Sequence, residues 1–392
     1  AVEGTSVEVG VRPVLAFWLT FLLLLPDSSF ADDMMRVLLM QDAQRVEVSA
    51  ERGVTVQMPN GDTRVFAGSV VARPSAGGLT LNGERAPAES VTIRSRGGDL
   101  TVTNGGTGTG ELKPLSVGGS LKILVRGNGL LLVNDVDLEE YIKGVVPAEM
   151  SPGWHPEALK AQAVVARTYA LYQRMLNKSR EYDLVATVQD QVYQGRQGVD
   201  HRVQEAVEST RGIAVAHQNA PIYAAFSSTA AGPTEDAVNV WSKDLPYLKG
   251  VDCPFDVNAP RYQWRAVLKV QDLENTFRRQ GVDVGAIASL TPFAYSKAGR
   301  VTKLRILHSR GELILRGEDF RRLIGYSVIL STQFDVESMG WEIALSGRGS
   351  GHAVGLCQWG AKEMAEHGYP YTTILAYYFP GTELRRTSSL SR

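Results

Sequence analysis

One stretch, residues 121–176, constrains the fold of this chain more than any other, because strand, turn and helix signals follow one another closely in it. Two apolar runs, 121–125 and 130–133, flank the tetrapeptide Arg-Gly-Asn-Gly. An Asn-Gly pair between apolar runs is the strongest short-range signal for a hairpin. We therefore predict two antiparallel strands that are joined at residues 126–129.

A short helix and a turn are predicted to follow this hairpin. Asp135 or Asp137 can cap a helix over residues 138–143, and Gly144 is its predicted end. Glu149 then stands as a lone acid among apolar neighbours, in the segment Val-Val-Pro-Ala-Glu-Met. An acid in such a setting is a candidate for chemistry, although a helix-terminal or salt-bridged acid is the plainer interpretation of the residue alone.

A long helix is predicted over residues 158–176, with Pro156 at a first helical position, where the missing N–H of proline costs nothing. Apolar residues recur in it at three- and four-residue spacing and charge is scarce, which is typical of a buried helix. Arg167 is the only charge in its middle. A buried guanidinium needs a carboxylate or an anionic ligand beside it, so we predict that Arg167 and Glu149 act together.

Four segments of the chain form an ordered set. They are VNDVDLEEYIKGVVPAEM with HPEALKAQAVVARTYAL, then DQVYQG, then FSSTAAGPTEDAVNVWSKDLPYLKGV, and finally GRGSGHAVGLCQWGAKEMAEHGY. This set extends from about residue 121 to residue 384 and resembles the signature of the stage II sporulation protein D family, whose members include peptidoglycan lytic transglycosylases. It is also similar to the pattern of amidase-enhancer proteins, which modify cell-wall hydrolases.

The resemblance implies a lytic transglycosylase that cleaves the glycan strand between N-acetylmuramic acid and N-acetylglucosamine and leaves 1,6-anhydro ends. In this reaction one carboxyl group acts first as acid and then as base, whereas ordinary glycoside hydrolysis uses two. Glu149 matches the family's catalytic glutamate, and its apolar neighbours can desolvate it and raise its pKa. Arg167 matches a family active-site arginine that orients the glutamate or a substrate acyl group.

The resemblance also implies side chains that contact the sugar. The predicted substrate-binding residues are Tyr193, Ser228, Thr229, His352 and Gln358. The chain departs from the family pattern at Ala231 and Ala353, where relatives have glycine. At Ala231 this puts a close backbone approach in question, and Ala353 would be strained if its position needs a positive φ.

Two other functions remain open. One is a non-catalytic cell-wall-binding modifier that stimulates an N-acetylmuramoyl-L-alanine amidase, which needs no acid. The other is a hydrolase with a second carboxylate such as Asp183 or Asp190, which would leave reducing ends in place of anhydro ends. The expected partners are peptidoglycan glycan strands and a cell-wall amidase, and no cofactor is expected.

Composition argues against a nucleic-acid partner. The 392 residues hold 41 Lys and Arg against 42 Asp and Glu, a formal net charge of −1, and such a balance predicts no basic patch. Hydrophobic residues make up 44% of the chain and charged residues 21%, as in ordinary globular proteins.

The start of the sequence is typical of an export signal. Arg12 precedes the apolar run 14–25, and the small residues Ser29 and Ala31 follow it, which predicts a secretory signal cleaved after Ala31. The run is shorter than the roughly 20 residues of a membrane-spanning helix, so no stable span is expected after cleavage, with an uncleaved anchor as the alternative. We therefore predict an exported, periplasmic or extracytoplasmic protein associated with the cell wall.

Three segments are expected: a signal peptide over residues 1–31, a β-rich N-terminal domain over 32–115 and a catalytic-type domain over 116–392. Short runs with turns every eight to twelve residues indicate the β-rich region. Beyond it, strands and helices mix without strict alternation, which predicts an α+β fold with mixed sheets and a long buried helix after the catalytic turn.

Cys253 and Cys357 are the two cysteines of the chain. We predict that they are unbridged, because each lies in a motif that needs its own geometry, and their separation lacks the spacing of a zinc site. Some relatives carry a metal cluster of cysteine and histidine shortly after the long helix, but residues 182–198 contain neither. The sequence therefore predicts no metal.

Overall fold

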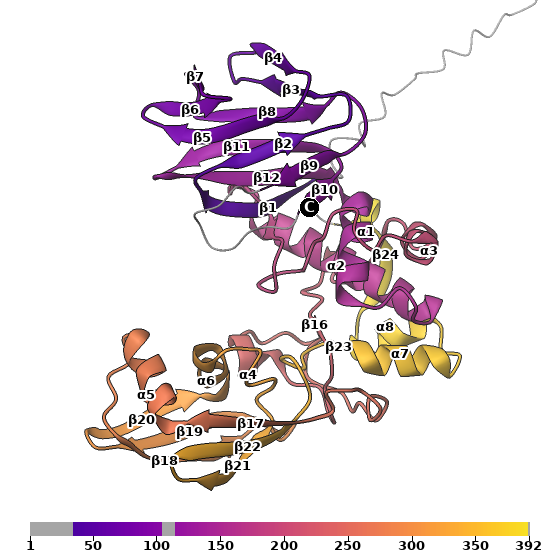
Figure 1. The fold of residues 1–392 in the computed structure, drawn as a ribbon. Coiled ribbons are helices and arrows are strands. Elements are labelled where there is room, and N and C mark those ends of the chain that lie inside the picture. The colour runs from indigo at the N-terminus through magenta and orange to yellow at the C-terminus, as the bar shows by residue number, and fades with distance from the viewer. Residues whose placement is uncertain (1–33, 104–113, 391–392) are drawn as a thin grey trace, which may run out of the picture. The chain divides into compact units, whose positions relative to one another are not determined.

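The computed structural model describes residues 34–103 and 114–390 (Figure 1). The predicted signal peptide, residues 1–31, and the glycine-rich run 104–110 lie outside these ranges. Within them, helices mix with strands that pair mostly antiparallel, which confirms the α+β class. No helix in the described ranges is both long and apolar enough to cross a membrane.

The first part of the chain builds two sheets whose inward-facing side chains share one hydrophobic core, which we call the first core. A seven-stranded sheet has the order β13-β1-β12-β11-β8-β3-β4, with the strands β1 (Met34–Ala43), β3 (Val54–Gln57), β4 (Thr63–Phe66), β8 (Ser90–Ser95), β11 (Ser120–Arg126), β12 (Gly129–Asp137) and β13 (Leu184–Val185). A six-stranded sheet has the order β10-β9-β2-β5-β6-β7, with β2 (Val46–Ser49), β5 (Val70–Ser75), β6 (Gly78–Leu81), β7 (Glu84–Ala86), β9 (Leu100–Thr103) and β10 (Leu115–Val117).

The predicted hairpin is the antiparallel pair β11 and β12, which closes with Arg126 opposite Gly129. On its outer sides, β12 pairs with β1 and β11 pairs with β8. The seven-stranded sheet therefore contains strands from both sides of the division expected at residue 115. That division into domains stays a prediction.

Helix α1 (Leu138–Glu149) is longer than predicted, and the helix end expected at Gly144 is wrong. Asp137 caps the helix by accepting the backbone N–H groups of Glu139 and Glu140. Gly144 lies inside the helix, where a Cβ atom would stand 2.5 Å from a ring carbon of Tyr193. The glycine therefore serves close packing, and the helix continues until Glu149 is its last residue.

The long helix is confirmed as α2 (Pro156–Leu176), which starts at the expected proline. It contacts α1, α3 (His201–Ser209), α7 (Gln358–Glu366) and α8 (Tyr371–Tyr378). The strand β14 (Ile213–His217) also packs on it and pairs with β15 (Ala220–Pro221) and β24 (Glu383–Arg386). The buried, alanine-rich middle of α2 is thus enclosed by α1, which precedes it, and by elements as far along the chain as α8 (Figure 1).

A second core lies between residues 263 and 348 and includes Phe277, Phe320 and Leu345. Two three-stranded sheets surround it, with the orders β17-β22-β21 and β18-β19-β20. Their elements are β17 (Gln263–Lys269), α5 (Val270–Arg279), β18 (Ile287–Tyr295), β19 (Val301–His308), β20 (Gly311–Arg316), α6 (Gly317–Ile324), β21 (Phe334–Met339) and β22 (Glu342–Arg348).

A short parallel pair joins the regions before and after the second core. β16 (Phe226–Ser227) pairs with β23 (Leu356–Cys357), and the helix α4 (Ala237–Trp241) lies between them in sequence. Before β16 the backbone forms tight local hydrogen bonds, such as Ala224 N–H to the carbonyl of Ile222, while the N–H of Ile222 still bonds the carbonyl of Val215 in β14.

Candidate functional site

Glu149 ends α1 as a half-buried acid. Its Oε1 accepts the backbone N–H of Val192 at 2.9 Å. Burial raises the pKa of Glu149, and the hydrogen bonds from Val192 and Gln358 oppose that shift only in part. Among the described residues, no Lys, Arg or His forms a salt bridge with it, and the C-terminal end of a helix disfavours a negative charge. The geometry thus makes this carboxyl group easier to protonate than that of an exposed glutamate.

Gln358 is the predicted site residue that the structure brings to Glu149. It is the first residue of α7, and its Nε2 donates to the backbone carbonyl of Glu149 at 3.3 Å. The same amide lies 3.5 Å from Oε1 of Gln162, a fully buried residue of α2 whose Nε2 has no hydrogen-bond partner in the described part of the chain. The end of α1, the body of α2 and the start of α7 therefore meet at this point.

Two tryptophans flank this point in sequence and lie against each other in space. Trp154 follows the end of α1, Trp359 follows Gln358, and their ring centroids are 5.0 Å apart in an edge-on arrangement. Both rings are half-buried, so each keeps a surface open to a ligand. Gln162, Trp154 and Trp359 were not predicted as site residues. The one signal in the sequence was Gln162, a glutamine among the alanines and valines of the helix.

Arg167 has a carboxylate beside it as predicted, but the partner is Glu139 and not Glu149. Its Nε and Nη2 donate to the two carboxylate oxygens of Glu139 at 2.8 and 2.6 Å, and its Nη1 donates to the carbonyl of Ile213 at 3.0 Å. Arg167 is fully buried. These bonds tie α2 to the start of α1 and to β14, and a role of Arg167 in the chemistry stays a prediction.

Tyr193 lies beneath α1 and not on an open surface. Only 5% of it is exposed, its hydroxyl donates to Oδ1 of Asn134 at 3.1 Å, and its ring lies 5.1 Å from that of Tyr141. Burial raises the pKa of its hydroxyl. The structure therefore places Tyr193 where it supports the helix that carries Glu149.

Ser228 and Thr229 follow β16 and approach the site through the backbone. The two hydroxyl groups are 3.3 Å apart, and the carbonyl of Ser228 accepts the N–H of Trp359 at 3.1 Å. Thr229 is buried and exchanges two backbone hydrogen bonds with Ser350. Ser228 is thus linked to the residue next to Gln358, whereas Thr229 holds two loops together.

His352 lies in the same glycine-rich loop as Ser350. Its Nδ1 accepts the N–H of Val354 at 3.0 Å, and its ring lies 4.8 Å from that of Trp241. Burial lowers the pKa of His352 to about 3. The imidazole is therefore neutral at neutral pH and suited to hydrogen bonding, not to carrying a positive charge.

Ala231 and Ala353 both adopt positive φ angles, of 55° and 59°. An L-residue with a Cβ atom pays about 1–2 kcal/mol for this conformation. Ala353 also donates its N–H to Oγ of Ser227 at 3.1 Å. The loop that follows β22 is thus held in a conformation better suited to glycine.

The second carboxylates considered for a hydrolase are engaged elsewhere. Asp183 is 1% exposed and forms a salt bridge to Arg36 at 2.5 Å. Asp190 accepts the hydroxyl of Tyr169 at 2.7 Å and the amide of Gln173 at 2.8 Å. Neither is positioned as a free base, which disfavours the hydrolase.

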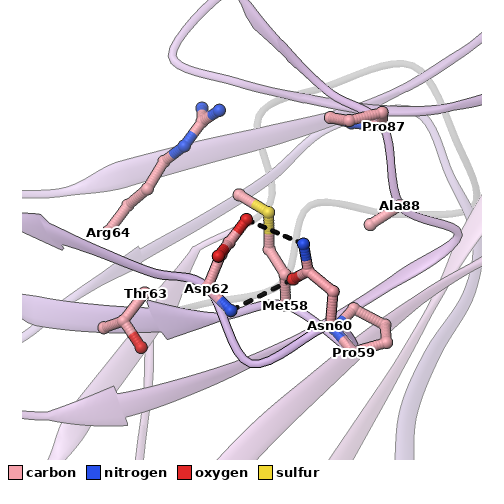
Figure 2. Close-up of a pocket in the computed structure, with 8 residues that line it drawn as sticks. All are labelled: Met58, Pro59, Asn60, Asp62, Thr63, Arg64, Pro87 and Ala88. Carbon is pink, nitrogen blue, oxygen red and sulfur yellow. Dashed lines mark hydrogen bonds between the residues drawn. The ribbon is translucent and has the colours of Figure 1, made fainter.

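A separate hollow of about 470 Å³ lies between the turn from β3 to β4 and the segment after β7 (Figure 2). It is lined by Met58, Pro59, Asn60, Asp62, Thr63, Arg64, Pro87 and Ala88. The side chains of Asn60 and Asp62 hydrogen-bond at 2.7 Å and close the turn. None of the predicted site residues lines this hollow, so it is distinct from the surroundings of Glu149.

Comparison with known families gives two matches along the chain. A family described as stage II sporulation protein matches residues 126–217, which include α1, α2 and Glu149. A domain of unknown function matches residues 238–355, which include the second core.

Three relatives show how far the similarity extends. An uncharacterized protein of Brachyspira hyodysenteriae is 35% identical over 68% of this chain and 71% of its own length. The stage II sporulation protein D of Bacillus amyloliquefaciens is 34% identical over 66% of this chain and 76% of its own length. An amidase enhancer of Bacillus subtilis is 31% identical over 62% of this chain, but over only 40% of its own length.

Proposed function

Because this chain belongs to the stage II sporulation protein D family, we propose that it is an exported peptidoglycan lytic transglycosylase with Glu149 as its single acid and base. It cleaves between N-acetylmuramic acid and N-acetylglucosamine. The observation that supports this function is a half-buried carboxyl group whose pKa is raised by burial and that forms no salt bridge among the described residues.

The reaction needs one proton and no water. Protonated Glu149 donates its proton to the glycosidic oxygen, and the bond from that oxygen to C1 of the muramic acid breaks. The carboxylate that results takes the proton of the O6 hydroxyl on the same sugar, and O6 bonds to C1 to close the 1,6-anhydro ring. A raised pKa suits this cycle, because a general acid is most effective when its pKa lies near the working pH.

The residues around Glu149 and those that hold α1 take two different roles. Trp154, Trp359 and Gln358 contact the glycan, since aromatic faces pack on sugar rings and an amide can bond their hydroxyl groups. Arg167 and Tyr193 act through α1, which they hold in place through Glu139 and Gly144.

The second candidate is a wall-binding modifier that stimulates a cell-wall amidase. The similarity to a protein named amidase enhancer supports it. Such a protein would keep the tryptophans but have no need of an acid with a raised pKa. The setting of Glu149 therefore favours the enzyme.

Mass spectrometry of purified glycan strands, with and without stem peptides, tests the proposal. The protein should release anhydro-ended fragments, and Glu149→Gln should slow their release at least about 100-fold, the usual loss when a general acid is removed. Glu205→Gln is the matched control, because it makes the same chemical change on the exposed side of α3 and should leave the rate unchanged.

Two results would count against the enzyme. Normal cleavage by Glu149→Gln would remove Glu149 from the reaction. Strands that stay intact with every variant, yet bind tightly and stimulate an added amidase, would establish the modifier instead.

A further inference from the structure

A buried cluster of three potential metal ligands lies outside the surroundings of Glu149. It consists of Cys253, Asp256 and Cys357, which are 2%, 1% and 1% exposed. One ligand atom from each lies within 4.8 Å of the other two. Asp256 follows Cys253 after two residues, the spacing of one half of a zinc knuckle, so the two cysteines are not alone in supplying ligands.

Asp256 keeps one carboxylate oxygen available to a cation. Its Oδ2 accepts the N–H of Ala231 at 2.8 Å and lies 3.2 Å from Sγ of Cys357. Its Oδ1 is buried and has no hydrogen-bond partner among the described residues. Arg300 is close enough to interact by charge, but its Nη2 donates to the carbonyl of Ala230. A buried carboxylate with an unused oxygen costs several kcal/mol unless a cation satisfies it.

The sulfur of Cys357 is fixed in place by backbone donors. Sγ of Cys357 accepts the N–H groups of Ala230 and Gly360, each at 3.4 Å, and Cys357 is the N-cap of α7. Gly360 has no room for a side chain, because its Cβ atom would stand 2.7 Å from Sγ of Cys253. N–H donors and a helix N-terminus both stabilise a thiolate.

We propose that Cys253, Asp256 and Cys357 bind one zinc-type divalent ion that fixes the start of α7. Zinc bonds of about 2.0–2.3 Å require ligand atoms roughly 3–4 Å apart. Sγ of Cys357 lies 3.2 Å from Oδ2 of Asp256, and the three ligand atoms all lie within 4.8 Å of one another. Two thiolates select zinc over magnesium or calcium. The hydroxyl of Tyr378, 3.2 Å from Sγ of Cys253, lies next to the fourth position.

The ion differs in place from the cysteine and histidine cluster of some relatives, since its ligands come from the loop before β17 and from β23. It anchors Cys357, the residue directly before Gln358. This inference does not depend on glycan cleavage, because the ion stabilises the junction whether or not Glu149 is catalytic.

Cobalt titration of the full chain, prepared without oxygen, tests the site. One Co²⁺ per chain should bind and produce thiolate-to-metal charge-transfer absorption, and zinc should displace it. Asp256→Asn should weaken binding at least about tenfold, since even the loss of an outer hydrogen-bond partner costs a metal site that much. Asp252→Asn, a neighbouring exposed acid, is the matched control and should bind normally.

Three outcomes would overturn the inference. They are no charge-transfer absorption, equal metal content in the wild type and in Cys253→Ser/Cys357→Ser, or a disulfide between the two cysteines in protein prepared without oxygen. If the serine variant does not fold, the cobalt titration and metal content of the wild type decide the matter alone.

Discussion

The guanidinium of Arg167 is fully buried, and its two hydrogen bonds to Glu139 join α2 to α1. Removing one partner of a buried ion pair leaves the other charge uncompensated. We expect Arg167→Met to lower the free energy of unfolding by about 3–5 kcal/mol. Arg167→Met combined with Glu139→Leu should cost much less, because no buried charge remains. Denaturant unfolding measures both.

The outcome also decides the role of Arg167. If Arg167→Met leaves stability unchanged but abolishes glycan cleavage, the arginine acts on the substrate or on Glu149. If stability falls and the double variant recovers both stability and activity, its role is to position α1.

Glu149 should make stability depend on pH. Its pKa in the folded protein is raised, so the folded state holds a proton that the unfolded state loses as pH rises through the ordinary pKa of glutamate. Stability contributed by this group therefore falls with rising pH until the folded pKa is passed. Glu149→Gln should be more stable than the wild type at pH 7, with no difference below pH 4.

Thermal unfolding at several pH values measures this difference. The Glu205→Gln control should show no such trend, because that residue is exposed. A constant difference between Glu149→Gln and the wild type at all pH values would mean that the carboxyl group does not titrate differently on folding.

Glu149 and Gln358, both predicted as site residues, lie in contact, whereas Arg167 was paired with the wrong acid. The wrong pairing follows from the prediction that the helix ends at Gly144. Glu139 and Glu149 lie ten residues apart in one helix, or about 15 Å at 1.5 Å per residue. One arginine cannot pair with both, and only the uninterrupted helix shows which acid it meets.

At the level of elements, the loop after β22 contains Ala353, whose φ of 59° is a left-handed conformation. Ala353→Gly should raise the free energy of unfolding by about 0.5–1 kcal/mol, because the relief of a left-handed alanine exceeds the entropy cost of glycine. Ala361→Gly, inside α7, should lower it by about 1 kcal/mol. Equal destabilisation by both changes would show that Ala353 is not strained.

Gly144 shows why element ends were harder to predict than the elements. Glycine after a helical run is a common stop signal. Here it lets Tyr193 pack directly on the helix backbone. Local sequence cannot distinguish these two uses, because the deciding contact comes from a residue about fifty positions further along.

At the level of the whole molecule, the two hydrophobic cores should respond separately to substitution. Phe320→Ala removes a fully buried ring from the second core and should cost that region about 3–5 kcal/mol. Hydrogen exchange should then speed up over residues 263–348 and stay unchanged in α2. Val164→Ala, in α2, is the reciprocal change: hydrogen exchange should speed up in α2 and stay unchanged over residues 263–348. Loss of protection throughout the chain would show that the two cores unfold as one unit.

Most strands of the first core were predictable from the alternation of apolar and polar residues along them. The strands with which they pair were not. β11 pairs with β8 and β12 pairs with β1, so each strand of the hairpin also borders a strand from before residue 115. Pairing of this kind depends on contacts across the whole chain and leaves no local pattern. The meeting of Cys253 with Cys357 escaped prediction for the same reason.

The parallel pair of β16 and β23 has a consequence for biosynthesis. The chain leaves the first core after Cys253 and returns to it at Ala353, so α7, α8 and β24 complete that core only after the second has been made. On the ribosome, the side of α2 that packs on α7 and α8 must therefore wait for residues 358–378 before it is covered. Chains released early would expose that face and be prone to aggregation or degradation, whereas the second core can assemble as soon as its own strands emerge.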